Sequence, residues 1–476
     1  MVFSSLIFVF LFLPLNLILY KFAPSIRAKN IVMLVFSLIF YTWGDPICLL
    51  LLVGMTFADW IIAIYIEGCR KRNKNAKFGL FLMGIVNLGL LCVFKYTTFF
   101  LSNIRLLTGF PQSVPQILLP IGISFYTFQL ISYVVDVYRG EVPAQRKFHF
   151  LLLYVSLFHQ CIAGPIVRYS DVAAELEDRK VTSADLSEGI WRFCVGLSKK
   201  AILANTCAVV CDTLLGVGTL SESVTTVGLW IGVLAFALQI YLDFSAYSDM
   251  AIGMGKMIGI HYLENFNYPY ISHSVTEFWR RWHMSLGSFF RDYVYIPLGG
   301  NRKGVMRTVI NLLIVWFLTG FWHGASWNFI LWGLYFFVFL IIEKFLLLKF
   351  VQKHKAVGVV YLLIVVYFGW ILFRFETIND IGRVFKGIFG FGTNTFWNVE
   401  TSAAIVPYLA ILIFSILAST PIFKIIGKKL YSLSFEYGAV TVIYTIGRIL
   451  IPVILLILST AALATDSYNP FLYFRF

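Results

Sequence analysis

The sequence predicts an all-α integral membrane protein with about eleven to thirteen transmembrane helices and a few short re-entrant or interfacial helices. Hydrophobic residues fill 59% of the 476 positions, charged residues only 13%, and the mean hydropathy is +0.82. A soluble domain carries about 25% charged residues, so lipid must be the solvent for most of this surface. Aromatic residues, at 18%, suit a protein that places many side chains at the headgroup boundary.

Apolar runs follow one another along the chain and are the predicted helices. A helix needs about 20 residues to span the membrane, so the run at 31–43 is short for a span. The run at 224–259 is long enough for one kinked pass or for two. The runs lie at roughly 1–22, 31–43, 47–66, 78–100, 117–138, 148–166, 187–215, 224–259, 306–322, 325–348, 356–374, 402–423 and 437–464.

The distribution of positive charge orients these helices. The net charge is +14, from 38 basic and 24 acidic residues, which in a soluble protein would suggest nucleic acid. Here the basic residues lie in short loops between apolar runs, as the positive-inside rule requires, so we expect no nucleic-acid partner. With the first helix starting outside, the predicted cytoplasmic loops contain Lys21, Arg27 and Lys29, then residues 70–77, 139–147, 302–307, 349–355 and 424–429.

Two hydrophilic stretches interrupt the pattern. Residues 167–186 are rich in acids, and residues 261–305 mix aromatic residues with arginines over a length too polar to span. No repeat, low-complexity tract or Pro/Gly linker divides the chain. We therefore expect a single polytopic domain over residues 1–476.

His323 is the leading candidate for a chemical role, because a histidine inside a membrane segment is costly. Sixteen helical residues separate it from Arg307 and rise about 24 Å, which places it deep in a hydrocarbon core of about 30 Å. Gly320 and Gly324 flank it, so backbone or substrate can approach closely. A neutral imidazole can take a proton from an alcohol or form a hydrogen bond between helices. Position alone leaves both readings open.

A second cluster combines tryptophan, arginine and histidine within 279–291. Trp279, Arg280, Arg281 and Arg291 could receive a phosphate-rich ligand, because arginine pairs phosphate in a bidentate way and stacks on flat rings. His283 lies among them. The alternative is an interfacial anchor helix whose arginines extend toward the headgroups beside a tryptophan belt.

Asp243 and Asp249 place two acids inside the apolar run at 224–259. Unpaired charges there are expensive, so we expect each to pair with an arginine or to line a wet cavity. A transporter or channel would also explain intramembrane acids and histidines, although no inverted repeat is visible. A scaffold for a polysaccharide synthase, without catalysis, is a third alternative.

Metal and nucleophilic catalysis have little support in the sequence. No HExxH or GxSxG motif occurs, and the spacing of His273 and His283 matches no common metal template. We expect no metal site. His149 and His354 lie near basic loops and suit the surface.

Five stretches of unusual composition resemble the membrane-bound O-acyltransferase (MBOAT) family, and within it a bacterial branch that serves O-acetylation of alginate and related polymers. The resemblance is strong over about 120–345 and looser on either side. The matching stretches are PIGISFYTFQLISYVVDVYRG at 120–140, IAGPIVRY at 162–169, LDFSAYSDMAIG at 242–253, NFNYPYISHSVTEFWRRWHMSLGSFFRDYVYIPLGGNRKG at 265–304 and LTGFWHGASWNFILWG at 318–333.

The resemblance implies a ring of membrane helices around a thin centre, in which funnels from both faces meet near a histidine. The family's catalytic histidine maps onto His323, and the histidine of its WH motif maps onto His283. The implied reaction moves an acetyl group from a cytoplasmic thioester to an extracytoplasmic hydroxyl for polysaccharide or cell-wall O-acetylation. Acetyl-CoA is the implied co-substrate, with no bound cofactor. A neighbouring branch instead transfers D-alanine to teichoic acid.

The same resemblance implies the protein's surroundings. We expect a multi-pass protein of the bacterial cytoplasmic membrane that works with a secreted or membrane-anchored partner of the SGNH type. The aromatic tail at 466–476 resembles the C-terminal motif of a small peptide of the D-alanylation system. Tyr473 carries the only hydroxyl in the last six residues, so it is a candidate acyl carrier; the alternative is an aromatic belt that anchors the last helix.

Overall fold

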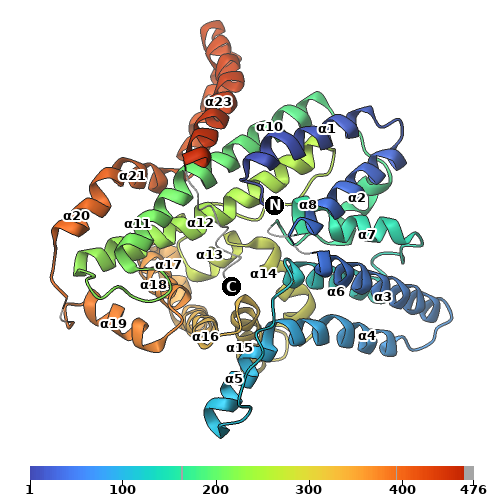
Figure 1. The fold of residues 1–476 in the computed structure, drawn as a ribbon, viewed down its shortest axis with the longest axis horizontal. Coiled ribbons are helices and arrows are strands. Elements are labelled where there is room, and N and C mark those ends of the chain that lie inside the picture. The colour runs from blue at the N-terminus through green and yellow to red at the C-terminus, as the bar shows by residue number, and fades with distance from the viewer. Residues whose placement is uncertain (45, 162–163, 393, 466–476) are drawn as a thin grey trace. The chain divides into compact units, whose positions relative to one another are not determined.

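The computed structural model of the chain describes residues 1–44, 46–161, 164–392 and 394–465. These residues form helices joined by loops and contain no strand (Figure 1). Within them, nine helical segments are long and apolar enough to cross a membrane, which confirms the predicted all-α membrane class. The nine are Pro46–Lys71, Lys77–Thr108, Ser183–Leu215, Thr226–Met257, Val305–His323, Trp327–Lys353, Lys355–Arg374, Val399–Ala418 and Gly438–Thr465.

The other apolar runs form shorter helices. The runs at 1–22, 31–43 and 117–138 become Phe8–Phe22, Ile26–Thr42 and Ile123–Arg139. The run at 148–166 breaks at Leu157, which has non-helical backbone angles (φ −44°, ψ 113°). By contrast, the run at 224–259 forms one unbroken helix of 32 residues. The expected eleven to thirteen segments therefore divide into nine full-length spans and a set of shorter helices.

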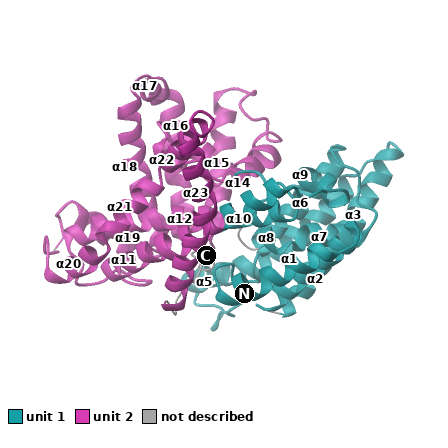
Figure 2. Cartoon of the chain, turned by 90° about the horizontal axis from the view of Figure 1, so that it is seen from above, with its two compact units in different colours: residues 1–193, 250–264 teal, residues 194–249, 265–476 magenta. Residues whose placement is uncertain are grey.

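The chain gathers into two compact units (Figure 2). Unit 1 comprises Met1–Phe193 and Met250–Glu264, and unit 2 comprises Cys194–Asp249 and Asn265–Phe476. Helices α10 (Ser183–Ser198) and α12 (Thr226–Met257) each contain residues of both units. Because helices rather than linkers cross these boundaries, no change of composition marks them in the sequence.

Unit 1 packs short helices around aromatic and polar contacts. Phe12 contacts Phe36 at 5.2 Å and Phe158 at 5.3 Å between ring centroids. Helix α4 continues through π-helical turns at Ile85–Gly89 and Cys92–Tyr96 into α5. Its helices are α1 (Leu13–Phe22), α2 (Ile26–Thr42), α3 (Pro46–Lys71), α4 (Lys77–Gly84), α5 (Thr97–Thr108), α6 (Ile123–Arg139), α7 (Phe148–Ser156), α8 (Phe158–Cys161), α9 (Tyr169–Glu177) and the first part of α10.

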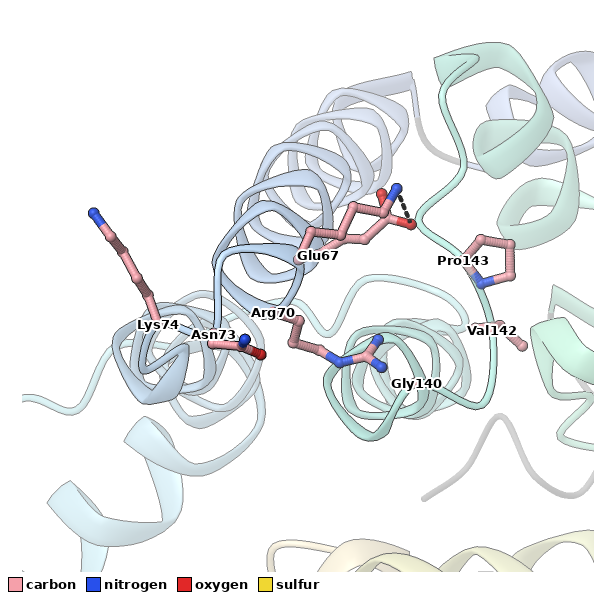
Figure 3. Close-up of a pocket in the computed structure, with 8 residues that line it drawn as sticks. Glu67, Arg70, Asn73, Lys74, Gly140, Val142 and Pro143 are labelled. Atoms are coloured by element: carbon pink, nitrogen blue, oxygen red, sulfur yellow. Dashed lines mark ion pairs between the residues drawn. The ribbon is translucent and has the colours of Figure 1, made fainter.

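A basic hollow lies where α3 and α6 end in unit 1 (Figure 3). Arg70 Nη1 donates to the carbonyl oxygen of Val137 at 2.8 Å, and Glu67 forms ion pairs with Arg146 and Lys71. Gly140 has a φ of +83°, and a Cβ there would lie 1.9 Å from Arg70 Nη2. The basic loops after α3 and after α6 therefore meet at one end of this unit, as their predicted common membrane side requires. Residues lining the hollow include Asn73, Lys74, Val142 and Pro143.

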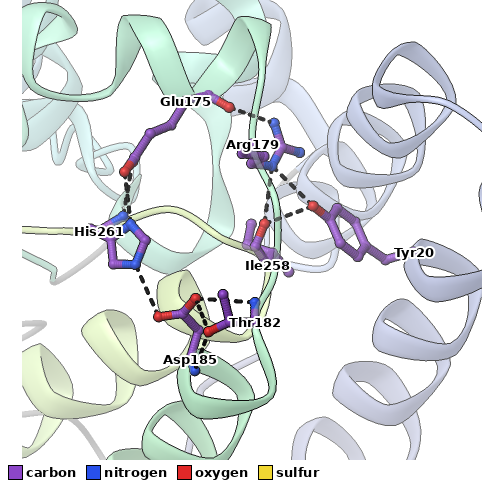
Figure 4. Close-up of polar contacts among 7 residues, drawn as sticks. All are labelled: Tyr20, Glu175, Arg179, Thr182, Asp185, Ile258 and His261. Carbon is purple, nitrogen blue, oxygen red and sulfur yellow. Dashed lines mark hydrogen bonds and ion pairs between the residues drawn. The ribbon is translucent and has the colours of Figure 1, made fainter.

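Two groups of polar contacts, one around Arg179 and one around His261, hold the turn after α12 in unit 1 (Figure 4). Arg179 Nε donates to Tyr20 Oη and to the carbonyl oxygen of Ile258, both at 3.0 Å. The His261 ring lies 2.7 Å from Glu175 Oε1 through Nδ1 and 3.3 Å from Asp185 Oδ1 through Nε2. We call His261, Glu175 and Asp185 the His261 clamp. It ties the acid-rich stretch predicted at 167–186 to residues about 80 positions later in the chain.

Unit 2 contains the longer helices and an extended aromatic core. Trp282, Trp316, Trp332 and Trp370 are all buried in this core. Helices α22 and α23 pack on one another, and α23 exposes most of its apolar side chains, as suits a lipid-facing helix. The helices of unit 2, besides its parts of α10 and α12, are α11 (Asn205–Leu215), α13 (Val275–Arg281), α14 (Met284–Phe290), α15 (Val305–His323), α16 (Trp327–Ile342), α17 (Leu348–Lys353), α18 (Lys355–Arg374), α19 (Ile378–Ile388), α20 (Val399–Ile405), α21 (Leu409–Ala418), α22 (Ile422–Ser434) and α23 (Gly438–Thr465).

Candidate functional site

His323 is the last residue of α15 and is buried in unit 2. The helix ends there because Gly324 adopts an extended backbone (φ −165°, ψ 151°). The side chain is packed by aromatic edges: Trp332 lies 5.0 Å from the imidazole centroid and Phe373 lies 5.5 Å from it. Only 5% of His323 is exposed. An imidazole buried against aromatic side chains is suited to proton transfer with a bound ligand.

A glycine crossing sets the position of His323. A Cβ on Gly320 of α15 would lie 2.3 Å from the carbonyl oxygen of Phe329, and a Cβ on Gly333 of α16 would lie 2.3 Å from that of Trp316. The two backbones therefore approach as closely as glycine allows. The sequence-based expectation of a close backbone approach at Gly320 is confirmed. This crossing brings Trp332 of α16 against the imidazole.

His283 lies between α13 and α14, also in unit 2. Its backbone is in the left-handed region (φ 44°, ψ 56°), which a non-glycine residue adopts only when its surroundings hold it. The holding contact is the main-chain N–H of Met284, which donates to the carbonyl oxygen of Asn265 at 2.9 Å. Only 2% of His283 is exposed. The Trp322 ring lies 6.3 Å from His283 and 5.1 Å from His323, so it contacts both histidines.

The hydrogen-bonding groups of His283 have unequal partners. Its Nδ1 lies 3.2 Å from Asn265 Oδ1. Its Nε2 is buried and has no hydrogen-bond partner among the residues that the structure describes. Burial lowers the pKa of His283 to about 3, so the ring is neutral at neutral pH. A neutral ring with one nitrogen left for a ligand is a feature of a binding or reaction site.

A buried carboxylate orients α13, the helix before His283. Glu343 is fully buried at the end of α16, and its two oxygens accept from the backbone N–H groups of Val275 at 2.6 Å and Thr276 at 2.9 Å. These are orphan donors of the first turn of a helix, where negative charge is favourable. Helix α16 thus supplies both Trp332 at His323 and the group that aligns α13.

The comparisons with known proteins identify the family of this chain. Residues 144–379 match the model of MBOAT, the membrane-bound O-acyltransferase family. The chain is 38% identical over 495 residues to the probable alginate O-acetylase AlgI of Pseudomonas putida, with 100% of both chains covered. The chain belongs to the membrane-bound O-acyltransferase family. It is therefore a membrane-embedded O-acyltransferase.

Two further relatives show how the MBOAT family varies. The peptidoglycan O-acetyltransferase of Helicobacter pylori is 33% identical over 426 residues, which cover 82% of this chain and 80% of the relative. The teichoic acid D-alanyltransferase of Bacillus subtilis is 28% identical over 294 residues, covering 59% of this chain and 71% of the relative. Alginate, peptidoglycan and teichoic acid are all acylated by these relatives, as their names state.

The candidate donor-binding residues of this MBOAT protein separate into three environments. Trp279 packs edge-on against Trp316 at 4.9 Å and Phe336 at 4.8 Å, inside the aromatic core. Arg281 is paired with Glu277 at 2.6 Å, and Arg291 is paired through two nitrogens with Asp292. Arg280 is exposed. The structure thus does not gather the three arginines and Trp279 into one cluster.

The intramembrane acids are paired with lysine, whereas we expected either arginine partners or a wet cavity. Lys200 Nζ lies 2.9 Å from Asp243 Oδ1, and both side chains are almost fully buried, at 3% and 2% exposed. Lys199 Nζ lies 2.8 Å from Asp249 Oδ2. The two lysines lie in the π-helical segment that follows α10 and face α12. Lys199 and Lys200 are neighbours on the π-helical segment, and Asp243 and Asp249 both lie on α12. Both ion pairs therefore belong to one contact between these two elements.

The other histidines have different surroundings. His149 and His354 are exposed, as predicted. His159 is buried in unit 1, where its Nδ1 lies 3.4 Å from Tyr262 Oη. Tyr473 falls in 466–476, outside the described residues.

Sequence reasoning missed several residues of the site. Asn265, Trp322, Trp332, Phe373 and Glu343 all contact or orient one of the two histidines. Asn265 could have been found from the sequence, because it is a polar residue at the start of an aromatic stretch that resembles the family. The aromatic residues offered none, because tryptophan and phenylalanine are abundant throughout the chain.

Proposed function

We propose that this MBOAT protein transfers an acetyl group from acetyl-CoA on the cytoplasmic side to a hydroxyl on the other side of the bacterial cytoplasmic membrane, for O-acetylation of a polysaccharide or of the cell wall. The observation that carries the proposal is His323, buried at the glycine crossing of α15 and α16. The names of the relatives add support, since AlgI and the peptidoglycan enzyme are both O-acetylating proteins.

In the proposed mechanism, His323 is the general base. It takes the proton of the acceptor hydroxyl while the oxygen attacks the thioester carbonyl. The carbon–sulfur bond then breaks, and the departing thiolate takes the proton back from the imidazolium. The products are the acetyl ester and free CoA, and His323 returns to its neutral form.

The test of this base is the His323→Ala variant. Transfer of label from acetyl-CoA to a hydroxyl acceptor should fall by at least about 100-fold, the usual contribution of a general base, while the detergent-purified variant keeps its melting temperature. Wild-type rates would end the proposal. Chelator should not change the activity, because we propose no metal. His354→Ala, an exposed position, is the matched control.

Arg280 is the best candidate for binding the donor's phosphates. It is exposed, whereas Arg281 and Arg291 already pair with carboxylates. Arg280→Glu should raise the KM for acetyl-CoA more than Arg281→Glu does. An unchanged KM for Arg280→Glu would remove this assignment.

We propose further that Tyr473 is the first acceptor hydroxyl and carries the acetyl group from acetyl-CoA toward the final polymer. The support is the resemblance of the tail and the chemistry of a phenol that can be acylated and can then pass the group on. Tyr473→Phe keeps the aromatic ring and removes the hydroxyl. Full acetylation outside the cell by that variant would exclude the carrier role. A secreted or membrane-anchored SGNH-type protein is the proposed recipient.

The second candidate function is D-alanyl transfer, favoured by the identity to teichoic acid D-alanyltransferase. Purified protein supplied with acetyl-CoA or with a D-alanyl carrier protein distinguishes the two by the donor it consumes. A transporter gains no support from Asp243 and Asp249, because both acids form ion pairs with lysine.

A further inference from the structure

Asn265 joins three parts of unit 2 from a fully buried position. Its Nδ2 donates to Ser248 Oγ of α12 at 3.0 Å. Its Oδ1 accepts from the backbone N–H of Ser285 at 3.2 Å and from Ser285 Oγ at 2.9 Å. A backbone N–H can only donate. The oxygen of the amide, and not its nitrogen, must therefore face Ser285.

The orientation of this amide determines the proton position on His283. Nδ1 of His283 lies 3.2 Å from the same Asn265 oxygen and 3.4 Å from Ser285 Oγ. Because the Ser285 hydroxyl donates to Asn265 Oδ1 at the shorter distance of 2.9 Å, Nδ1 faces two oxygen acceptors and carries the hydrogen. The ring is packed by the uncharged side chains of Phe244 at 4.7 Å, Phe266 and Trp322. Such surroundings disfavour the doubly protonated ring. Nε2 is then left with a lone pair, buried and without a partner among the described residues.

We propose that Asn265 is a positioning residue that holds His283 as the Nδ1–H tautomer, so that Nε2 accepts a hydrogen bond from the bound substrate. The inference rests on the proposed acyl transfer. The group that Nε2 recognises is a neutral N–H or O–H donor. Two substrates supply one: the amide N–H of the pantetheine arm beside the thioester, and the acceptor hydroxyl.

This tautomer decides which role His283 can have. The oxyanion that develops during acyl transfer needs a hydrogen-bond donor. A neutral ring with a lone pair at Nε2 repels an oxyanion. In this arrangement His283 orients a substrate, and the charge that develops on the carbonyl oxygen must be stabilised by other groups.

The tautomer can be measured without any activity. In protein labelled with ¹⁵N-histidine, the signals that disappear in the His283→Gln variant belong to His283. At neutral pH they should show a protonated Nδ1 and an unprotonated Nε2. An Nε2–H tautomer, or an imidazolium, would overturn the inference. This result is independent of the His323→Ala test, so either proposal can fail alone.

Kinetics test the acceptor role. His283→Gln keeps an amide oxygen near the position of Nε2, whereas His283→Asn keeps only the group near Nδ1. We expect Gln to retain at least tenfold more activity than Asn; equal losses would contradict the acceptor role. If the His283→Asn change raises only the KM for acetyl-CoA, the hydrogen bond to Nε2 comes from the pantetheine amide. If it raises only the KM for the acceptor, the hydrogen bond comes from the acceptor hydroxyl.

Two variants of Asn265 separate positioning from folding. Asn265→Asp keeps an oxygen acceptor for Nδ1 and should retain activity at high pH. Its added carboxylate favours the imidazolium, so activity should fall on acidification at a higher pH than in the wild type. Asn265→Leu removes the acceptor and should lose activity at every pH. Activity and pH profile unchanged in both variants would overturn the positioning role.

Discussion

Two buried histidines contact one tryptophan, Trp322, yet they differ in their surroundings. His323 is enclosed by Trp332 and Phe373 at the end of a helix. His283 is fixed through Nδ1 by Asn265 and has a left-handed backbone. A base must move a proton during the reaction, whereas a positioning group must keep its proton where it is. The network around Asn265 suits the second task.

Acid stability tests the neutral state of His283. Its pKa is about 3 in the folded protein against about 6.5 in the unfolded chain, so the unfolded state binds more protons between these values. The resulting stability is complete above about pH 6.5 and is lost as the pH falls toward 3, by up to about 1.4 kcal/mol per pH unit.

His283→Gln should therefore weaken the fall of melting temperature on acidification, measured in detergent from neutral pH to about pH 4. His149→Gln, at an exposed position of unit 1, is the control and should leave the profile unchanged. An identical acid profile for wild type and His283→Gln would show that the ring is not held neutral.

At the scale of elements, one hairpin of helices organises the site. Helix α15 ends in His323, α16 carries Trp332, and Glu343, the residue directly after α16, caps α13. Gly320 and Gly333 make the close crossing possible. A substitution at the crossing should therefore shift His323 and lower activity, although the substituted residue does not itself contact the imidazole.

Gly320→Ala should move the two helices apart. The new Cβ meets the backbone oxygen of Phe329, which cannot rotate away as a flexible side chain would. We expect a loss of about 1–3 kcal/mol, as for an overpacked core, together with reduced transfer. Gly427→Ala in α22 has open space and should be neutral or slightly stabilising. Equal melting temperatures and rates for both variants would contradict the crossing.

The Lys200–Asp243 pair is a second contact between elements, joining the segment after α10 to α12. Removing one partner leaves a buried charge, so Asp243→Leu should cost roughly 3–5 kcal/mol. The double change Lys200→Met with Asp243→Leu should recover most of that loss. Glu264→Gln breaks the more exposed pair with Arg192 and should cost no more than about 1 kcal/mol. Additive losses in the double variant would argue against a direct pair.

At the scale of the whole molecule, each unit is held together by contacts between distant parts of the sequence. In unit 1 the His261 clamp connects the turn after α12 with α9 and α10. The hydrogen bond to Glu175 raises the pKa of His261, Asp185 adds to this effect, and burial opposes it. Both ring nitrogens face carboxylate oxygens, which only accept hydrogen bonds. Because only the imidazolium has an N–H on each nitrogen, the charged ring makes both contacts.

The clamp should make stability depend on pH on the alkaline side. The pKa of His261 is higher in the folded protein than in the unfolded chain, so the contribution is complete below about pH 6.5 and is lost as the pH rises through the folded value. His261→Gln should make the melting temperature less dependent on pH in that window, and Glu175→Gln should have the same effect. His354→Gln is the exposed control. A fall with rising pH that persists in His261→Gln would exclude the clamp as its cause.

The amino-acid sequence by itself determined the class of this protein and most of its membrane-spanning segments, and it singled out His323 as the candidate histidine. Hydropathy is a sum over residues that are neighbours in the sequence, and the free-energy cost of a histidine in an apolar run depends on the same neighbours. Both can therefore be inferred from the sequence alone. The same holds for the glycines beside His323. Long motifs resemble those of its family, and the comparisons confirm that the chain belongs to it.

Only the tertiary structure decided which partner each polar group has. Lysine rather than arginine neutralises Asp243, two of the three candidate arginines are engaged by carboxylates, and Asn265 lies on the proton-bearing side of His283. The pairs Arg281–Glu277 and Arg291–Asp292 are local in the chain. The sequence could not determine the partners of Asp243 and His283, because these depend on which helix faces meet. His323 was found as a costly residue; its aromatic enclosure and the tautomer of its neighbour follow from packing alone.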